Sequence, residues 1–176
     1  MKGGVVWVDG LPSSGKTTLA RRVAAGLAAA GRPALLLDGD EVRAALVPAP
    51  GYDPASRDAF YETLAGLAAL AAAQGLVAVV AATSCRRAHR EAARRLWPGL
   101  VEAFVDVPPE TCARRDAKGL WARAARGELE DLPGAGAPFE RPEAPEVTAR
   151  GGEDAGAVEE VLRRLGAAAR PAAGAG

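Results

Sequence analysis

The stretch VVWVDGLPSSGKTTLARR, residues 5–22, decides how the rest of the chain is interpreted. It opens with an apolar run, residues 5–9, which breaks into a loop of small and turn-forming residues. An Ala-rich segment follows over residues 17–30 and ends before Gly31, a residue type that commonly follows the last turn of a helix. The stretch therefore predicts a strand, a tight loop and a helix in direct succession.

The loop over residues 10–17, GLPSSGKT, matches the pattern G-x-x-x-x-G-K-[ST] at every position, between the strand and the helix that this pattern requires. Glycine lets the backbone wrap around a phosphate, and the N-terminus of the helix favours negative charge. Lys16 would reach the β- and γ-phosphates, and the Thr17 hydroxyl would coordinate Mg²⁺. Thr18 either joins this site or is simply the second residue of the helix. The predicted triphosphate-binding residues are Gly10, Leu11, Pro12, Ser13, Ser14, Gly15, Lys16, Thr17 and Thr18.

Strand and helix patterns alternate along the whole chain, which predicts an α/β fold, a parallel sheet with helices on both faces. The expected strands are residues 5–9, 34–37, 76–81 and 100–106. The expected helices are residues 17–30, 41–46, 56–74 with Ser56 as N-cap, 86–96, one around Cys112, 120–126 and 153–165. We expect one domain over residues 1–166 and a disordered tail over 167–176. Residues 116–146 are polar and rich in Pro and Gly, as lids often are.

The composition excludes several classes of protein. The formal net charge of the 176 residues is zero, so no strong field points to nucleic acid or to a membrane. The apolar stretch 64–82 has the length of a membrane span, but Gln74 and Gly75 divide it into a helix and a buried strand. Two cysteines and no signal-peptide pattern suggest a reducing cytoplasm. The basic segment 86–95, with His89, is expected to be a solvated helical face.

A second strand, residues 34–37, leads directly into Asp38 and Asp40. In an open parallel sheet the carboxyl ends of the strands face the ligand, so both carboxylates would lie near the phosphates. Asp38 could orient Mg²⁺, and Asp40 could approach an acceptor hydroxyl. The alternative is a plain Asp-Gly turn. Arg43 and Arg57 follow, and two arginines near the cleft suggest an anionic second substrate.

Four blocks of this chain, in this order, resemble the adenylylsulfate kinase (APS kinase) family: GLPSSGKTT, LLDGDEVR, GYDPASR and residues 104–146. The last block carries Cys-x-x-Arg-Asp, Lys-Gly-Leu, Pro-Phe-Glu and Pro-Glu-x-Pro-Glu. The resemblance implies a fold like that of nucleoside monophosphate kinases, and transfer of the ATP γ-phosphate to the 3′-hydroxyl of adenosine 5′-phosphosulfate (APS) in sulfate activation. It also implies Mg²⁺ as cofactor and a homodimer, since the family tends to dimerise.

The resemblance assigns roles position by position. The catalytic residues it implies are Lys16, Asp38, Asp40 and Ser84, and the metal ligands are Thr17 and Asp38. Arg114 and Arg115 would meet ATP. The residues implied to contact APS are Asp40, Arg43, Tyr52, Arg57, Ser84, Lys118 and Leu132. Trp121 would either cover a bound ring or pack in the interior.

The acceptor side departs from the family pattern. Glu41 stands where the family has Asn, Cys85 where it has Pro, and Leu132 where it has Phe. Phe60, Glu62 and Thr63 replace an Asn and paired arginines, and Glu130 and Asp131 replace Lys-Gly. Glu62 would repel an anionic acceptor if it faces inward. These departures keep two alternatives open: a kinase of this fold for another small hydroxyl acceptor, and a regulatory protein that binds ATP without catalysis.

Overall fold

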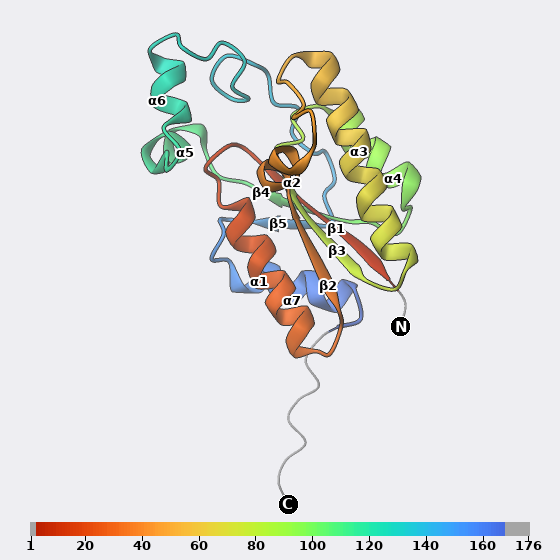
Figure 1. Cartoon of the computed structure of the whole chain (residues 1–176). Helices are drawn as coiled ribbons and strands as arrows, with labels where there is room; N and C mark the ends of the chain where they lie inside the picture. The colour runs from red at the N-terminus through yellow and green to blue at the C-terminus, as the bar shows by residue number, and fades with distance from the viewer. Residues whose placement is uncertain (1–2, 168–176) are drawn as a thin grey trace, which may run out of the picture.

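The computed structural model describes residues 3–167 of the chain. Its centre is a parallel sheet of five strands in the order β2-β3-β1-β4-β5 (Figure 1). The strands are β1 (Gly4–Gly10), β2 (Ala34–Asp38), β3 (Val77–Ala82), β4 (Val101–Val105) and β5 (Val147–Ala149). The predicted α/β fold with a parallel sheet is therefore confirmed.

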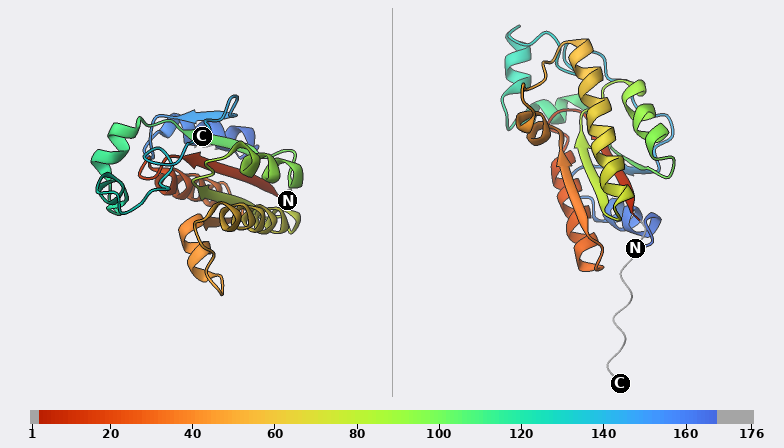
Figure 2. Two further views of the ribbon diagram at one scale, coloured as in Figure 1. Left: turned by 90° about the horizontal axis from the view of Figure 1, so that it is seen from above. Right: turned by 45° about the vertical axis from the view of Figure 1, so that its right-hand side comes forward.

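Helices cover both faces of the sheet, as the two further views in Figure 2 show. Within residues 3–167 they are α1 (Lys16–Ala29), α2 (Gly39–Ala45), α3 (Pro54–Ala73), α4 (Arg87–Leu96), α5 (Pro109–Arg115), α6 (Leu120–Ala125) and α7 (Ala155–Arg164). Helices α1 and α7 pack together on one face, and α3 and α4 on the other. Helices α5 and α6 lie beyond the sheet, near the carboxyl ends of the strands (Figure 1).

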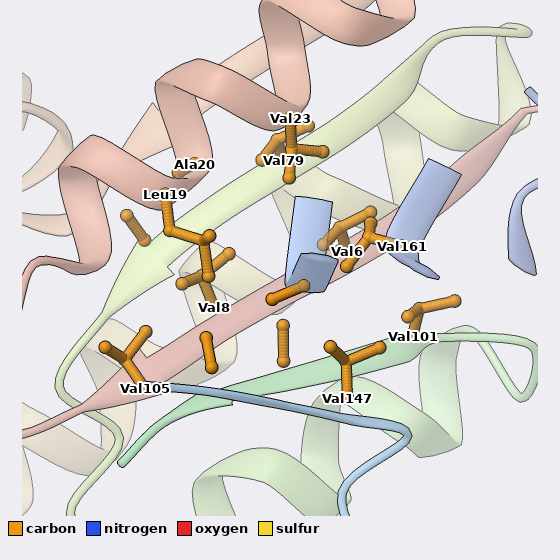
Figure 3. Close-up of a cluster of buried hydrophobic side chains, with 14 of the residues drawn as sticks. Val6, Val8, Leu19, Ala20, Val23, Val79, Val101, Val105, Val147 and Val161 are labelled. Atoms are coloured by element: carbon orange, nitrogen blue, oxygen red, sulfur yellow. The ribbon is translucent and has the colours of Figure 1, made fainter. Parts of the chain in front are cut away.

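The side chains of β1 alternate between the two faces, as a buried strand requires. Val6 and Val8 pack with Leu19 and Val23 of α1, in the cluster of Figure 3. Trp7 points to the opposite face and packs among residues of α3. Val6, Trp7 and Val8 of β1 and Leu19 and Val23 of α1 are all fully buried. A strand with apolar side chains on both faces fits a central position in a sheet that helices cover on both sides. This position places the loop that follows β1 at the centre of the sheet edge.

The predicted element boundaries lie within two residues of the observed ones, but two helix starts and one missed strand need a physical explanation. Helix α3 begins at Pro54 with Asp53 as its N-cap, so the prediction of Ser56 was wrong; the Asp53 side chain accepts from the Ser56 N–H at 3.0 Å. Helix α2 begins at Gly39, directly after β2, because Asp38 caps it. Strand β5 was missed, since three residues after a Pro-rich segment give too short an apolar pattern to detect.

The long apolar stretch resolves as predicted into a helix and a strand. Helix α3 ends at Ala73, Gly75 adopts φ 89°, and β3 starts at Val77. No helix within residues 3–167 combines the length and apolar character that crossing a membrane demands. Ala167, expected at the start of a tail, is buried in the core, and residues 168–176 of that predicted tail lie outside the described residues.

Candidate active site

A cavity of about 1310 Å³ opens at the carboxyl ends of the strands. One end is lined by the loop after β1, and the middle by the ends of β2 and β3. Segment 116–146, the expected lid, lines one wall, together with α2 and the start of α3. The far end is lined by the turn between β5 and α7. This is the position at which open parallel sheets bind their ligands.

The phosphate loop, residues 10–17, has the backbone that its glycines allow. Gly15 adopts φ 103°, and a Cβ atom there would lie 2.6 Å from the Gly152 nitrogen. Lys16 is half-buried, and its Nζ donates to the Leu11 carbonyl at 2.7 Å. The Ser14 hydroxyl is buried and finds no hydrogen-bond partner within residues 3–167. An anion in the loop would supply acceptors for such donors, so the loop fits a phosphate group.

Thr17 and Asp38 meet as the sequence predicts, because α1 starts beside the end of β2. The Thr17 hydroxyl donates to Asp38 Oδ2 at 2.6 Å. The other oxygen, Asp38 Oδ1, accepts from the Asp40 N–H at 3.0 Å. One hydroxyl and one carboxylate beside a phosphate loop fit Mg²⁺, which takes few protein oxygens and completes its shell with phosphates and waters. No group of three or more acidic, His or Cys side chains in residues 3–167 could hold a metal ion alone.

Asp9, which sequence reasoning missed, lies fully buried at the end of β1. Its Oδ1 accepts from the N–H groups of Gly10 at 2.7 Å and Ser84 at 3.0 Å, and Arg90 lies 3.4 Å from Oδ2. Burial raises the pKa of Asp9 to about 7, against the opposing effect of the Arg90 charge. Burial also lowers the pKa of Lys16 to about 8, and the charge of Asp9 opposes that shift. An acidic residue directly before the first loop glycine was the signal available in the sequence.

Arg43 forms the floor of the acceptor side. It is buried, and its Nη1 donates to the carbonyls of Pro50 at 3.0 Å and Gly51 at 2.7 Å. Its guanidinium carbon lies 3.9 Å from the ring centroid of Phe60 and 4.5 Å from that of Tyr52. Phe60, one of the departures from the family pattern, therefore supports Arg43 through a cation–π contact.

Two ion pairs connect segment 116–146 to the acceptor side. Arg57 pairs with Asp131 at 2.9 Å, and Lys118 pairs with Asp40. The hydrogen bond from Lys118 to Asp40 raises the pKa of the ammonium group. All four side chains line the cavity. Segment 116–146 thus closes over the predicted acceptor residues through charged contacts.

The family model described as Adenylylsulphate kinase matches residues 2–150 of the chain. This chain belongs to that family. It is an enzyme of the adenylyl-sulfate kinase type, and two of its curated relatives carry that name. The adenylyl-sulfate kinase of Paraburkholderia xenovorans is 43% identical over 142 residues, 80% of this chain and 79% of the relative. That of a Synechococcus species is 39% identical over 152 residues, 86% of this chain and 87% of the relative.

Solved structures give the same result for the fold. The structure of the Mycobacterium tuberculosis APS kinase CysC in complex with AMPPNP and APS matches with a TM-score of 0.87 and 34% identity. The match covers 94% of this kinase and 98% of that chain. The nucleotide-binding α/β fold predicted from the phosphate loop is therefore confirmed.

Several predicted site residues do not line the cavity of this kinase. Ser84 is fully buried, and its hydroxyl accepts from Trp7 Nε1 at 2.7 Å, so its predicted contact with substrate has no support from this arrangement. Arg114 is exposed and donates to Thr111 at 2.8 Å, away from the cavity. Arg115 does line it, and its Nη1 donates to the Ser14 carbonyl at 3.3 Å.

The departures from the family pattern separate into three groups: exposed residues outside the cavity, a buried residue outside it, and residues that line it. Glu41, Glu62 and Thr63 are exposed and do not line the cavity, so the condition for repulsion by Glu62, an inward orientation, is not met. Cys85 is buried, and burial raises the pKa of its thiol. Phe60, Asp131 and Leu132 do line the cavity. Leu132 is buried and gives the wall an apolar surface.

The prediction of a solvated face on α4 was wrong for His89 and Arg90, which are buried. His89 Nε2 lies 2.8 Å from Asp58 Oδ1, and its ring stacks on Tyr61 with 4.2 Å between centroids. Arg90 donates to the Ser84 carbonyl at 2.6 Å. Both acquire partners because α4 packs against α3 and the end of β3, which the local sequence does not reveal.

Two further features were open or missed. Trp121 packs in the interior: it is buried, and its Nε1 donates to the Pro12 carbonyl at 3.1 Å, so it supports the phosphate loop from α6. The turn between β5 and α7 was missed, although Thr148, residues 150–154 and Glu160 line the far end of the cavity. The sequence signal for this turn was the pair Gly151-Gly152. The structure shows why glycine is needed there, because a Cβ atom at residue 152 would lie 2.6 Å from Thr18 Cβ.

Proposed function

We propose that this chain transfers the γ-phosphoryl group of ATP to the 3′-hydroxyl of APS, giving ADP and the 3′-phosphorylated product. The observation that carries the proposal is the shared cavity, which joins the phosphate loop to Arg43, Arg57 and Tyr52. A kinase needs both substrates in one water-poor space, whereas a nucleotide sensor needs no arginines for a second anion. The structural relative from Mycobacterium tuberculosis holds AMPPNP and APS together.

The nucleotide end would bind and polarise the triphosphate. In the proposal, the N–H groups of the phosphate loop and the Ser14 hydroxyl bind phosphate oxygens, and Lys16 neutralises the charge that develops on the transferring group. Thr17 and Asp38 would hold Mg²⁺, which when bound neutralises phosphate charge. Arg115 reaches the loop from α5 and can add positive charge at the same place.

The acceptor end would orient the attacking hydroxyl. Asp40 is exposed in the first turn of α2, two residues after the end of β2, and is paired with Lys118. The bond between the 3′-oxygen and the γ-phosphorus forms while the bond from that phosphorus to the bridging oxygen of ADP breaks. The proton of the hydroxyl passes to the Asp40 carboxylate, and ADP leaves with the electron pair of the broken bond. Positioning supplies most of the rate enhancement in such a loose transfer.

Segment 116–146 would act as the lid. It reaches the phosphate loop through Trp121 and the acceptor side through Lys118 and Asp131. A segment with contacts to both ends can cover both substrates and exclude water from them, which suppresses hydrolysis of ATP.

A coupled ADP-release assay tests the proposal, with Mg-ATP and either APS, AMP or no acceptor. We expect strong release that depends on APS, with a product whose fragment masses place the new phosphate on the 3′-oxygen. Release without acceptor would indicate an ATPase. ATP binding with no response to APS would refute the proposal and direct the search to other hydroxyl acceptors.

Compartment and assembly are part of the same proposal. Cys85 and Cys112 are both buried and free, which suits a reducing cytoplasm. A homodimer stays a prediction from the family resemblance, and sedimentation of the purified chain tests it.

A further inference from the structure

Arg57, the arginine expected to bind an anionic acceptor, already has an anionic partner within the protein. Its Nη2 donates to two atoms of Asp131, the carboxylate Oδ2 at 2.9 Å and the backbone carbonyl at 3.0 Å. Its Nε donates to the Tyr52 carbonyl at 2.5 Å. The Arg57 side chain is 14% exposed and that of Asp131 is 52% exposed. The guanidinium is thus mostly enclosed, while the carboxylate is open to solvent.

The two residues line the same cavity but come from segments far apart in the sequence. Arg57 lies in the first turns of α3, and Asp131 lies 74 positions later in segment 116–146. Both line the cavity, and the exposed Lys118–Asp40 pair lies in the same cavity. An anionic group that approaches Arg57 therefore meets the Asp131 carboxylate at the same donors.

We propose that Asp131 is a specificity-determining residue, a built-in anion that competes with the acceptor for Arg57. The inference rests on the proposed function in two respects: the acceptor is anionic, and the product carries one more phosphate. Like charges at one site repel, so the Asp131 carboxylate lowers the affinity of Arg57 for any bound anion. The repulsion increases with the charge of the bound anion. Asp131 therefore weakens binding of APS, and weakens still more the binding of the product, which carries an additional phosphate.

The physical consequence is that a highly charged product dissociates from the cavity faster. Charges of both signs line the cavity, but without Asp131 the mostly enclosed Arg57 would hold a bound anion longer. The carboxylate of Asp131 reoccupies Arg57 as the product leaves, so the arginine is never left without a partner. Exposed ion pairs contribute modestly, so the expected effect is a few-fold change in affinity rather than an all-or-none change.

The test compares Asp131→Asn with Glu130→Gln, a matched removal of one carboxylate from an exposed neighbour that does not line the cavity. Asparagine keeps the backbone carbonyl contact and the size of the side chain. We expect Asp131→Asn to lower the KM for APS and the Kd from calorimetric titration about 3- to 5-fold, and to lower the Kd of the product more. Glu130→Gln should leave these values unchanged. A KM and Kd that stay the same or rise in Asp131→Asn would overturn the inference.

Two further arms separate this inference from the proposed function. In the Arg57→Gln background, Asp131→Asn should have no effect; a persisting effect would mean that Asp131 acts elsewhere. Inorganic sulfate, titrated against the protein saturated with AMPPNP, serves as an anion probe that does not depend on the acceptor. Sulfate should bind several-fold more tightly to Asp131→Asn than to the unsubstituted protein, and equal binding would overturn the inference. Loss of APS-dependent turnover in the unsubstituted protein would refute only the proposed function.

Discussion

Backbone contacts set the geometry at the phosphate loop, whereas side-chain ion pairs set it at the acceptor side. Around the loop, Gly15 lies against Gly152, and Lys16 and Trp121 donate to loop carbonyls. Across the acceptor side, Arg57 pairs with Asp131 and Lys118 with Asp40. The loop contacts leave little freedom, while exposed ion pairs contribute about 0–1 kcal/mol each and exchange readily. The first region suits a triphosphate that is the same in every kinase, and the second suits substrate choice and motion.

The largest expected effect is at the phosphate loop. Lys16→Met should lower kcat about 100- to 1000-fold, because it removes a charge aimed at the transferring phosphoryl group. Arg21→Met on the exposed face of α1 is the control and should leave kcat unchanged. Steady-state kinetics and thermal melting of both variants measure this. More than a tenth of the original kcat in Lys16→Met would mean that the loop does not carry the chemistry.

At Arg57 we expect the binding of APS, and not the chemical step, to change. Arg57→Ala should raise the KM for APS about 10- to 100-fold, since hydrogen bonds to charged groups contribute about 1.5–3 kcal/mol, and should leave the KM for ATP within about twofold. Arg95→Ala, an exposed arginine of α4, is the control. If the KM values for ATP and APS rise together, the two ends of the cavity are not independent.

The pH dependence of kcat/KM for ATP tests the charge of Lys16 in the phosphate loop. Burial lowers the pKa of Lys16 from 10.5 to about 8, so the free enzyme loses this charge as the pH rises through that value. We expect kcat/KM for ATP to fall about tenfold per pH unit above about pH 8, and kcat to fall only at higher pH, because bound phosphates favour the charged lysine. Lys16→Arg keeps its charge and should abolish this decline. An unchanged decline in Lys16→Arg would assign it to another group.

The smallest effect is expected at Glu62, which is exposed on α3 and does not line the cavity. Glu62→Gln should change the KM for APS by less than about twofold, because solvent screens an exposed charge at a distance. Steady-state kinetics with varied APS, at low and at high salt, measure this KM. A several-fold decrease in KM at low salt would show that Glu62 does act on the acceptor, and that departures from the family pattern outside the cavity also matter.

The sequence by itself determined the nucleotide end. Eight consecutive residues, a strand before them and a helix after them specify the phosphate loop, because its geometry depends on local backbone and on glycine at residues 10 and 15. The placement of Asp38 and Asp40 followed as well, since the carboxyl ends of parallel strands share one edge. The family resemblance came from contiguous blocks of the same kind.

Only the tertiary structure decided which charges meet. Asp9 and Arg90 are 81 positions apart, and Arg57 and Asp131 are 74 apart, so no periodicity links them. His89 is buried because α4 packs on α3, although its local sequence reads as a solvated basic helix. The physical reason is common to all three. A charged side chain takes its burial and its partner from whatever the fold places beside it, and its neighbours along the chain do not specify that partner.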